Sequence, residues 1–119
     1  MASQHEGCVF CRLVREGPHV AAAPGFVAIE DINPQAAVHL LIIPERHLES
    51  FREIGALTAA ESKQMLEFLA GTARSSGLQD YRVIANVGSS AGQSVFHLHW
   101  HVLGEPAGAA GGPPGAAGA

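Results

Sequence analysis

Three histidines alternate with apolar residues near the end of this sequence, and the alternation constrains the fold more than any other feature. The segment reads His97-Leu-His-Trp-His101, and Val-Leu carries the pattern on to residue 103. A β-strand sends successive side chains to opposite faces. The pattern therefore predicts a strand over residues 95–103 with the three imidazoles on one face. The opposite face is apolar and carries Phe96, Leu98, Trp100 and Val102.

The spacing of the histidines limits the chemistry of this face. At a rise of ~3.3 Å per residue, His97 and His101 lie about 13 Å apart along a straight strand. One metal ion cannot bind all three, although a neighbouring pair could. Residues 86–94 upstream are a small glycine-rich loop, whose backbone N–H groups could hold phosphate oxygens. Because imidazoles titrate near neutrality, the loop and the strand indicate phosphoryl or nucleotidyl transfer. The alternative is an exposed histidine face without catalysis.

The domain organisation follows from length and composition. The chain has 119 residues, which predicts one domain. We place this domain at residues 8–104, after a flexible N-terminus over residues 1–7. Residues 105–119 are almost all glycine, alanine and proline, so we expect a disordered tail there. The core of so short a chain is small, which favours dimerisation.

Charge and hydropathy exclude several classes of partner. The 7 Lys and Arg residues are scattered and are outnumbered by 11 Asp and Glu residues, for a net charge of −4. Binding to a nucleic-acid duplex or to an anionic membrane would require a basic patch. Residues 1–6 are polar and do not form a secretory signal, and no run of about 18 apolar residues could span a membrane. We therefore expect a cytoplasmic protein that binds neither nucleic acid nor membrane.

The remaining pattern predicts an α+β fold with a mainly antiparallel sheet. We expect a short helix over residues 8–15, strands over 26–30 and 38–43, and a helical turn over 47–54. A long helix follows over residues 58–75, with a capping box from Thr58 to Glu61. Strands over 81–87 and 95–103 complete the order, and the absence of repeated crossovers favours antiparallel pairing. The packing face of the long helix is predicted to carry Met65, Leu66, Leu69 and Ala73.

The two cysteines, Cys8 and Cys11, are spaced C-x-x-C. Redox chemistry would need a strand before them, and a disulfide is disfavoured in the cytosol. They could form half of a zinc site completed by two histidines, for which His47 and His97 are suitable. The alternative is a pair of plain structural thiols.

Several motifs together resemble the histidine triad (HIT) superfamily, in its nucleotide-binding (Hint) branch. Residues 97–103 resemble the family's alternating triad, and Gly92-Gln-Ser-Val-Phe resembles the approach to it. Residues 31–47, with Asp31, His39 and His47, are similar to the other long family motif, and Asn86-Val-Gly88 resembles the Hint branch. The C-x-x-C pair looks like the zinc-binding variant. The resemblance implies the HIT-like α+β fold and a two-fold homodimer.

The resemblance also implies roles for individual residues. His99 matches the nucleophile that forms a nucleotidyl-histidine, His101 matches the histidine on the phosphate oxygens, and His39 matches a supporting histidine. Asp31 matches the ribose-binding carboxylate, although beside Asn-Pro it could equally stabilise a turn. The other implied nucleotide-binding residues are Ile32 and Asn33 at the base, Asn86 and Gly92 at the phosphate, and Gln93 and the catalytic Ser94 at the leaving group. The implied zinc ligands are Cys8, Cys11, His47 and His97.

The resemblance implies a hydrolase of purine nucleoside 5′-phosphoramidates, with structural zinc and with no cofactor needed for catalysis. A purine nucleotide or nucleoside phosphoramidate would be its ligand. The alternatives are a diadenosine polyphosphate hydrolase, a nucleotide-binding adaptor with incidental catalysis, and a small metalloprotein. One departure concerns the leaving group: the Hint branch carries a tryptophan in its C-terminal segment, whereas the only tryptophan here is Trp100.

Overall fold

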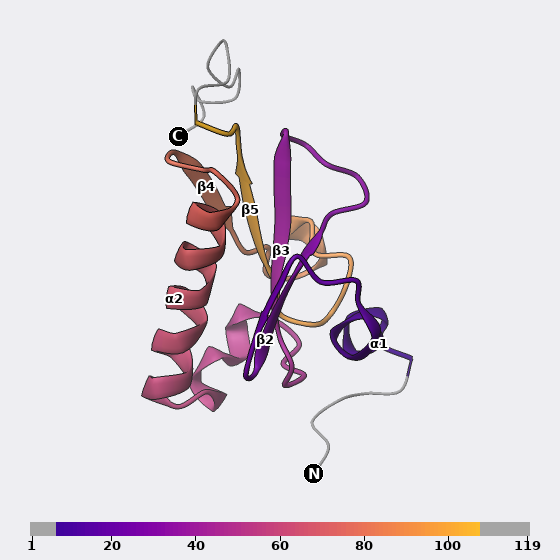
Figure 1. The fold of residues 1–119 in the computed structure, drawn as a ribbon. Coiled ribbons are helices and arrows are strands. Elements are labelled where there is room, and N and C mark those ends of the chain that lie inside the picture. Colours follow the sequence, from indigo (N-terminus) through magenta and orange to yellow (C-terminus); the bar gives the residue numbers. More distant parts are fainter. Residues whose placement is uncertain (1–6, 108–119) are drawn as a thin grey trace.

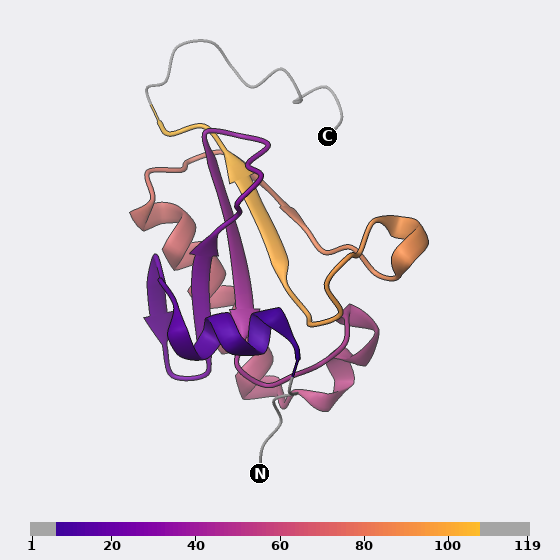
Figure 2. The ribbon, with the colours of Figure 1, turned by 90° about the vertical axis from the view of Figure 1, so that its right-hand side faces the viewer.

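A five-stranded antiparallel sheet lies between two helices in the computed structural model, which describes residues 7–107 (Figures 1 and 2). The α+β fold with a mainly antiparallel sheet is therefore confirmed. The helices are α1 (Val9–Glu16) and α2 (Ala59–Ser75), with short 3-10 turns η1 (Phe51–Ala56) and η2 (Ser89–Ala91). The strands are β1 (Ala21–Ala23), β2 (Phe26–Glu30), β3 (Val38–Pro44), β4 (Tyr81–Ile84) and β5 (Trp100–Gly104), and their order in the sheet is β1-β2-β3-β5-β4.

Strand β3 is buried on both faces, which explains why its sequence is a continuous apolar run. Leu40 and Ile42 pack in the cluster that contains Leu69 and Ala73 of α2. The intervening Leu41 and Ile43 pack on the other face with Phe10 and Val14 of α1. Each of these four β3 side chains is at most 6% exposed. Burying one such side chain contributes roughly 1.5–3 kcal/mol, so β3 is the centre of the core.

Helix α2 begins at the predicted capping box. Thr58 Oγ1 accepts a hydrogen bond from the Glu61 N–H at 3.0 Å, and Glu61 accepts one from the Thr58 N–H at 2.8 Å. The packing face differs from the prediction at one position. Leu66 is 50% exposed, and Thr72 is buried together with Met65, Leu69 and Ala73. The buried face of α2 is therefore shifted round the helix, with Thr72 in place of Leu66.

The predicted faces of the histidine strand are largely confirmed, but its bounds are not. Leu98 and Val102 are buried on the α2 side, whereas Phe96 is 44% exposed. Ladder pairing starts only at Trp100, because the Leu98 N–H donates to the Leu48 carbonyl at 2.6 Å, outside the sheet. His97 and His99 therefore lie in the segment that leads into β5.

Two other strands differ from the prediction. Strand β4 ends at Ile84, not at residue 87. Strand β1 was not predicted, since three alanines carry no strand pattern. It forms because Pro24-Gly25 makes a tight connection to β2, with φ +93° at Gly25.

The chain after β5 remains attached to the domain for a few residues. Glu105 accepts a hydrogen bond from the Ala37 N–H, and the Ala107 N–H donates to the Gly77 carbonyl. The expected flexible start and disordered tail otherwise fall on residues 1–6 and 108–119, outside the described residues. Within residues 7–107, no helix combines the length and the apolar character needed to cross a membrane.

Candidate functional site

The sheet register brings His39 and His101 together. His39 pairs with Leu103 and His101 with Leu41, so the two histidines are diagonal neighbours on the same face of the antiparallel pair. His39 Nε2 lies 2.9 Å from His101 Nδ1. The His101 ring lies 5.2 Å from the His99 ring, measured between centroids. Phe10 of α1 closes the group, with its ring centroid 4.9 Å from that of His99.

Backbone groups determine where the protons of these imidazoles lie. The Gln35 N–H donates to His39 Nδ1 at 3.0 Å, so the proton of His39 is on Nε2. From there it points to His101 Nδ1, and the proton of His101 is consequently on Nε2. His99 is held in the opposite way, because its Nδ1–H donates to the His97 carbonyl at 2.7 Å. His99 therefore has a free lone pair on Nε2, whereas His101 has an N–H donor at that atom.

Burial keeps both of these imidazoles neutral. It lowers the pKa of His99 below the ordinary value of about 6.5. This effect outweighs two that raise the pKa, the hydrogen bond that His99 donates to the His97 carbonyl and the charge of the Asp31 carboxylate. Burial likewise lowers the pKa of His101, and the neighbouring His99 and His39 lower it further, against the raising effect of Asp31. A neutral imidazole is the form that can attack an electrophile.

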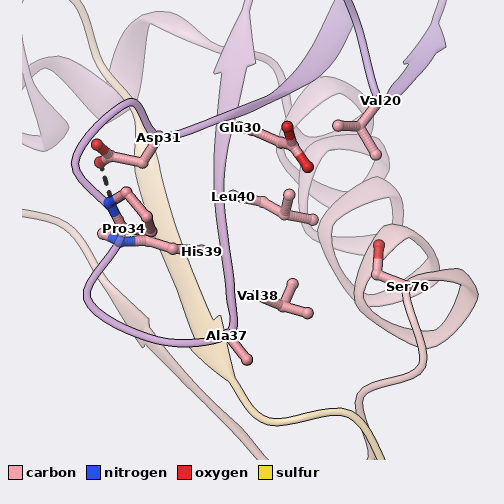
Figure 3. Close-up of a pocket in the computed structure, with 9 residues that line it drawn as sticks. All are labelled: Val20, Glu30, Asp31, Pro34, Ala37, Val38, His39, Leu40 and Ser76. Carbon is pink, nitrogen blue, oxygen red and sulfur yellow. Dashed lines mark ion pairs between the residues drawn. The ribbon is translucent and has the colours of Figure 1, made fainter.

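Asp31 lies at the edge of the imidazole group, where β2 ends. Its Oδ1 accepts a hydrogen bond from the Asn33 N–H at 2.8 Å, so it does stabilise the turn. Its Oδ2 lies 3.3 Å from His39 Nε2 and 3.9 Å from His101 Nδ1. Figure 3 shows Asp31 and His39 on one side of β3, while Val38 and Leu40 point to the other side, toward α2. Asp31 thus joins the turn to the imidazoles.

Two cavities adjoin Asp31. One of about 340 Å³ is lined from both sides of β3, by Asp31 and His39 on one side and by Leu40 and Ser76 on the other (Figure 3). The other, of about 480 Å³, lies beside α1 and includes the predicted Ile32, which is 92% exposed. Asn33 is exposed on the same turn. The sequence did not single out the other residues of the larger cavity, which come from α1, the next loop and β2: Leu13, Pro18, His19, Val20, Ile29 and Glu30.

The glycine loop returns to the histidine face through Val95, which packs with the α1-side cluster. Asn86 donates from Nδ2 to the Ala91 carbonyl at 2.8 Å, and Gly92 lies against Asn86 with φ +95°. The positive φ explains why glycine is needed there. Gln93 is buried and Ser94 is exposed.

The four predicted metal ligands come together on the α1 side. Cys8, Cys11, His47 and His97 offer ligand atoms that lie within 4.8 Å of one another. The sulfur–nitrogen distances are 3.4 Å from Cys8 Sγ to His97 Nδ1, 3.3 Å from Cys11 Sγ to His47 Nδ1 and 3.5 Å from Cys11 Sγ to His97 Nδ1. In a tetrahedral site with sulfur at about 2.3 Å and nitrogen at about 2.0 Å from the metal, the sulfur–nitrogen distance would be about 3.5 Å. The cluster could therefore hold a metal ion.

Proton positions separate this cluster from a second group of possible ligands. His97 Nε2 donates to the Pro44 carbonyl at 2.8 Å, which leaves Nδ1 unprotonated and directed at the thiols, as metal-binding histidines require. Asp31, His39 and His101 also lie within 4.8 Å of one another. His39 Nε2, however, carries the proton, because its Nδ1 accepts from the Gln35 N–H. The second group is better explained as a hydrogen-bond chain.

Comparison with known proteins gives a consistent result. The HIT domain family matches residues 14–108. An uncharacterised HIT-like protein of Chlamydia trachomatis is 43% identical over 103 residues, which cover 83% of this chain and 85% of that protein. Protein HitA of Neisseria gonorrhoeae is 35% identical over 105 residues, which cover 85% of this chain and 98% of that protein.

Solved structures agree with these matches. A HIT family hydrolase from Clostridium thermocellum superposes with a TM-score of 0.75 at 35% identity, covering 91% of this chain and 98% of that one. A histidine triad protein from Clostridium difficile gives a TM-score of 0.74 at 31% identity, covering 84% and 91%. The family match includes the imidazoles and the glycine loop but begins after Cys8 and Cys11.

The lowered pKa values predict a specific acid response. In NMR titrations of the folded protein, His99 and His101 should reach half-protonation below about pH 6.5, whereas in urea-unfolded chain they should titrate near that value. The unfolded state then binds more protons, so the free energy of unfolding should decrease as the pH falls from 6.5 toward the folded pKa values. A folded-state midpoint at or above 6.5 for both residues would contradict this prediction.

Proposed function

This chain belongs to the HIT domain family, and from that premise we propose that it hydrolyses purine nucleoside 5′-phosphoramidates to the nucleoside monophosphate and an amine. One observation carries the proposal: the unprotonated Nε2 of His99 lies beside His101, whose Nε2 bears a proton. A nucleophile is thus placed next to a donor suited to a phosphoryl oxygen. The related Clostridium thermocellum protein is named as a hydrolase, which supports a hydrolytic reaction.

In the proposed reaction, His99 Nε2 attacks phosphorus and the phosphorus–nitrogen bond breaks, giving a nucleotidyl-histidine. The Nε2–H of His101 donates to a phosphoryl oxygen, so the departing amine takes its proton from solvent water, relayed by the Ser94 hydroxyl. A second water then attacks phosphorus and gives its proton back through the same relay, the bond to Nε2 breaks, and the monophosphate leaves with His99 regenerated. This covalent route divides one difficult displacement into two easier ones.

We assign nucleotide binding to the residues around this pair. The Asp31 carboxylate has about four acceptor sites, so it can accept from the ribose hydroxyls while holding the Asn33 N–H. The larger cavity, with Ile32 at its rim and Asn33 on the same turn, would take the base. Asn86 and the loop up to Gly92 would surround the phosphate. His39 supports His101 through their shared hydrogen bond.

We further propose that the metal of the cysteine–histidine cluster is Zn²⁺ in a structural role, since two thiolates and two imidazoles form a closed tetrahedral set. A bound zinc would link the start of α1 to two other segments. These are the loop after β3, through His47, and the segment before β5, through His97. The catalytic steps above use none of its ligands. Zinc binding requires that Cys8 and Cys11 stay reduced, and a reducing cytosol would keep them so. We therefore propose that the enzyme is cytoplasmic.

Replacing the nucleophile tests the proposed mechanism. His99→Ala should lower turnover of adenosine phosphoramidate by several orders of magnitude. Its affinity for AMP should change by less than about tenfold, since binding relies on Asp31 and the loop. Rapid quench of wild-type protein should trap the nucleotide on His99, and Gln64→Ala, at an exposed position of α2 outside the site, should keep wild-type rates. A label on Ser94 or His101 would exclude this mechanism, and a diadenosine polyphosphate in the same assay separates the two leaving-group classes.

Metal analysis tests the zinc proposal. Protein purified without chelator should contain about one zinc per chain. Cys8→Ser should lose most of that zinc and melt at a lower temperature, because metal binding is coupled to folding. Chelator-treated wild type provides the matched comparison. If the metal-free protein melts no lower than the loaded protein, the metal has no structural role.

The proposal also includes a homodimer. Strand β4 pairs only with β5 in the described part of the chain, so its outer edge is open. Val83 on β4 and Leu66 on α2 are 44% and 50% exposed. Sedimentation at micromolar concentration should give roughly twice the 12.4 kDa chain mass, and Val83→Asp should shift it toward the monomer. A monomeric wild type would refute the dimer.

A further inference from the structure

The Gln93 side chain is buried in the loop that leads to the histidines, at 5% exposure. Its Nε2 donates to two carbonyls, that of Glu49 at 2.7 Å and that of Val95 at 3.1 Å. Its Oε1 accepts from the Gly88 N–H at 2.8 Å. A glutamine amide has two N–H donors, so both are used in these bonds.

We propose that Gln93 is a positioning residue that holds the glycine loop, residues 88–92, in the shape that binds phosphate, and that it does not contact the leaving group. The inference rests on the proposed function. It assigns Gln93 a place different from the one implied by family resemblance. To reach a leaving group, the amide would have to abandon three backbone groups in a buried setting, where unsatisfied polar groups are costly.

Gln93 closes the loop by binding both main-chain groups of Gly88, its N–H and its carbonyl. Its side chain accepts from the Gly88 N–H, and its own backbone N–H donates to the Gly88 carbonyl at 3.1 Å. Gly88 has φ +88° and Gly92 has φ +95°, conformations that ordinary residues rarely adopt. Backbone N–H groups in such a turn form a concave anion site only while the turn keeps its shape.

The Glu49 bond attaches this loop to residues 44–49, the segment that also carries His47. Three carbonyls of the segment accept from the histidine region: Pro44 from His97 Nε2, Leu48 from the Leu98 N–H and Glu49 from Gln93. The glycine loop and the metal cluster therefore share one support. The Gln93 side chain joins the glycine loop to this support through its bond to the Glu49 carbonyl.

A monophosphate separates positioning from leaving-group contact, because AMP has no leaving group. Gln93→Glu keeps an acceptor for the Gly88 N–H but places oxygen against two carbonyls, and Gln93→Met removes all three bonds. By calorimetry, both variants should bind AMP at least tenfold more weakly, while Gln64→Met, at an exposed glutamine of α2 outside the site, should bind like wild type. For each Gln93 variant, the loss of kcat/KM relative to wild type should be the same, within about threefold, for substrates with good and with poor amine leaving groups.

The opposite pattern would overturn the proposal. It consists of AMP affinity within twofold of wild type, together with a rate loss that grows as the amine becomes a poorer leaving group. Hydrogen exchange in wild-type protein gives a second test that needs no variant. The Gly88 amide should be protected in the free protein and stay protected with AMP or with a non-hydrolysable phosphoramidate analogue. Loss of protection only with the analogue would show Gln93 turning toward the leaving group.

Failure of the proposed function gives a different result. If wild-type protein neither binds AMP nor cleaves phosphoramidates, the hydrolase proposal fails. Exchange at Gly88 in free wild type then decides whether Gln93 holds the loop: protection supports the positioning role, and rapid exchange refutes it.

Discussion

His97 is the residue on which the two halves of the site depend. Its Nδ1 faces both thiols, its Nε2–H donates to the Pro44 carbonyl, and its own carbonyl accepts the proton of His99. The side chain is completely buried, where each unpaired polar group would be costly. The orientation of His99 is therefore set by a residue whose side chain belongs to the metal cluster. The side chain of His97 thus belongs to the metal cluster, while its backbone carbonyl orients the proposed nucleophile.

The sheet supplies the other constraint. The pairing of β3 with β5 places His39 beside His101, and the burial of β3 on both faces leaves little freedom for that register to slip. A slip by one residue would send His39 to the α2 side, into the cluster around Leu69 and Ala73. The same packing that stabilises the domain thus determines which imidazoles meet.

Local patterns predicted much of this arrangement. The capping box located the start of α2, and alternation assigned Leu98 and Val102 to the apolar face and the histidines to the other. The C-x-x-C spacing, with two histidines, predicted a cluster that the structure does assemble. The start of β5 was wrong because Leu98 donates to Leu48, a partner 50 residues earlier in the chain. The wall of the larger cavity was missed because it combines residues of α1, the loop after it and β2, and no pattern within any one segment indicates that the three share a cavity.

Proton positions were beyond the reach of the sequence for a related reason. The state of His39 depends on a main-chain N–H, that of Gln35, and main-chain groups are the same in nearly every residue. The path of the backbone between β2 and β3 therefore sets the tautomer of His39, a task that a side chain usually performs. The bond to His39 uses only the main-chain N–H of residue 35, which every amino acid but one supplies. Proline has no N–H to donate, so it alone would leave His39 free to take the other tautomer.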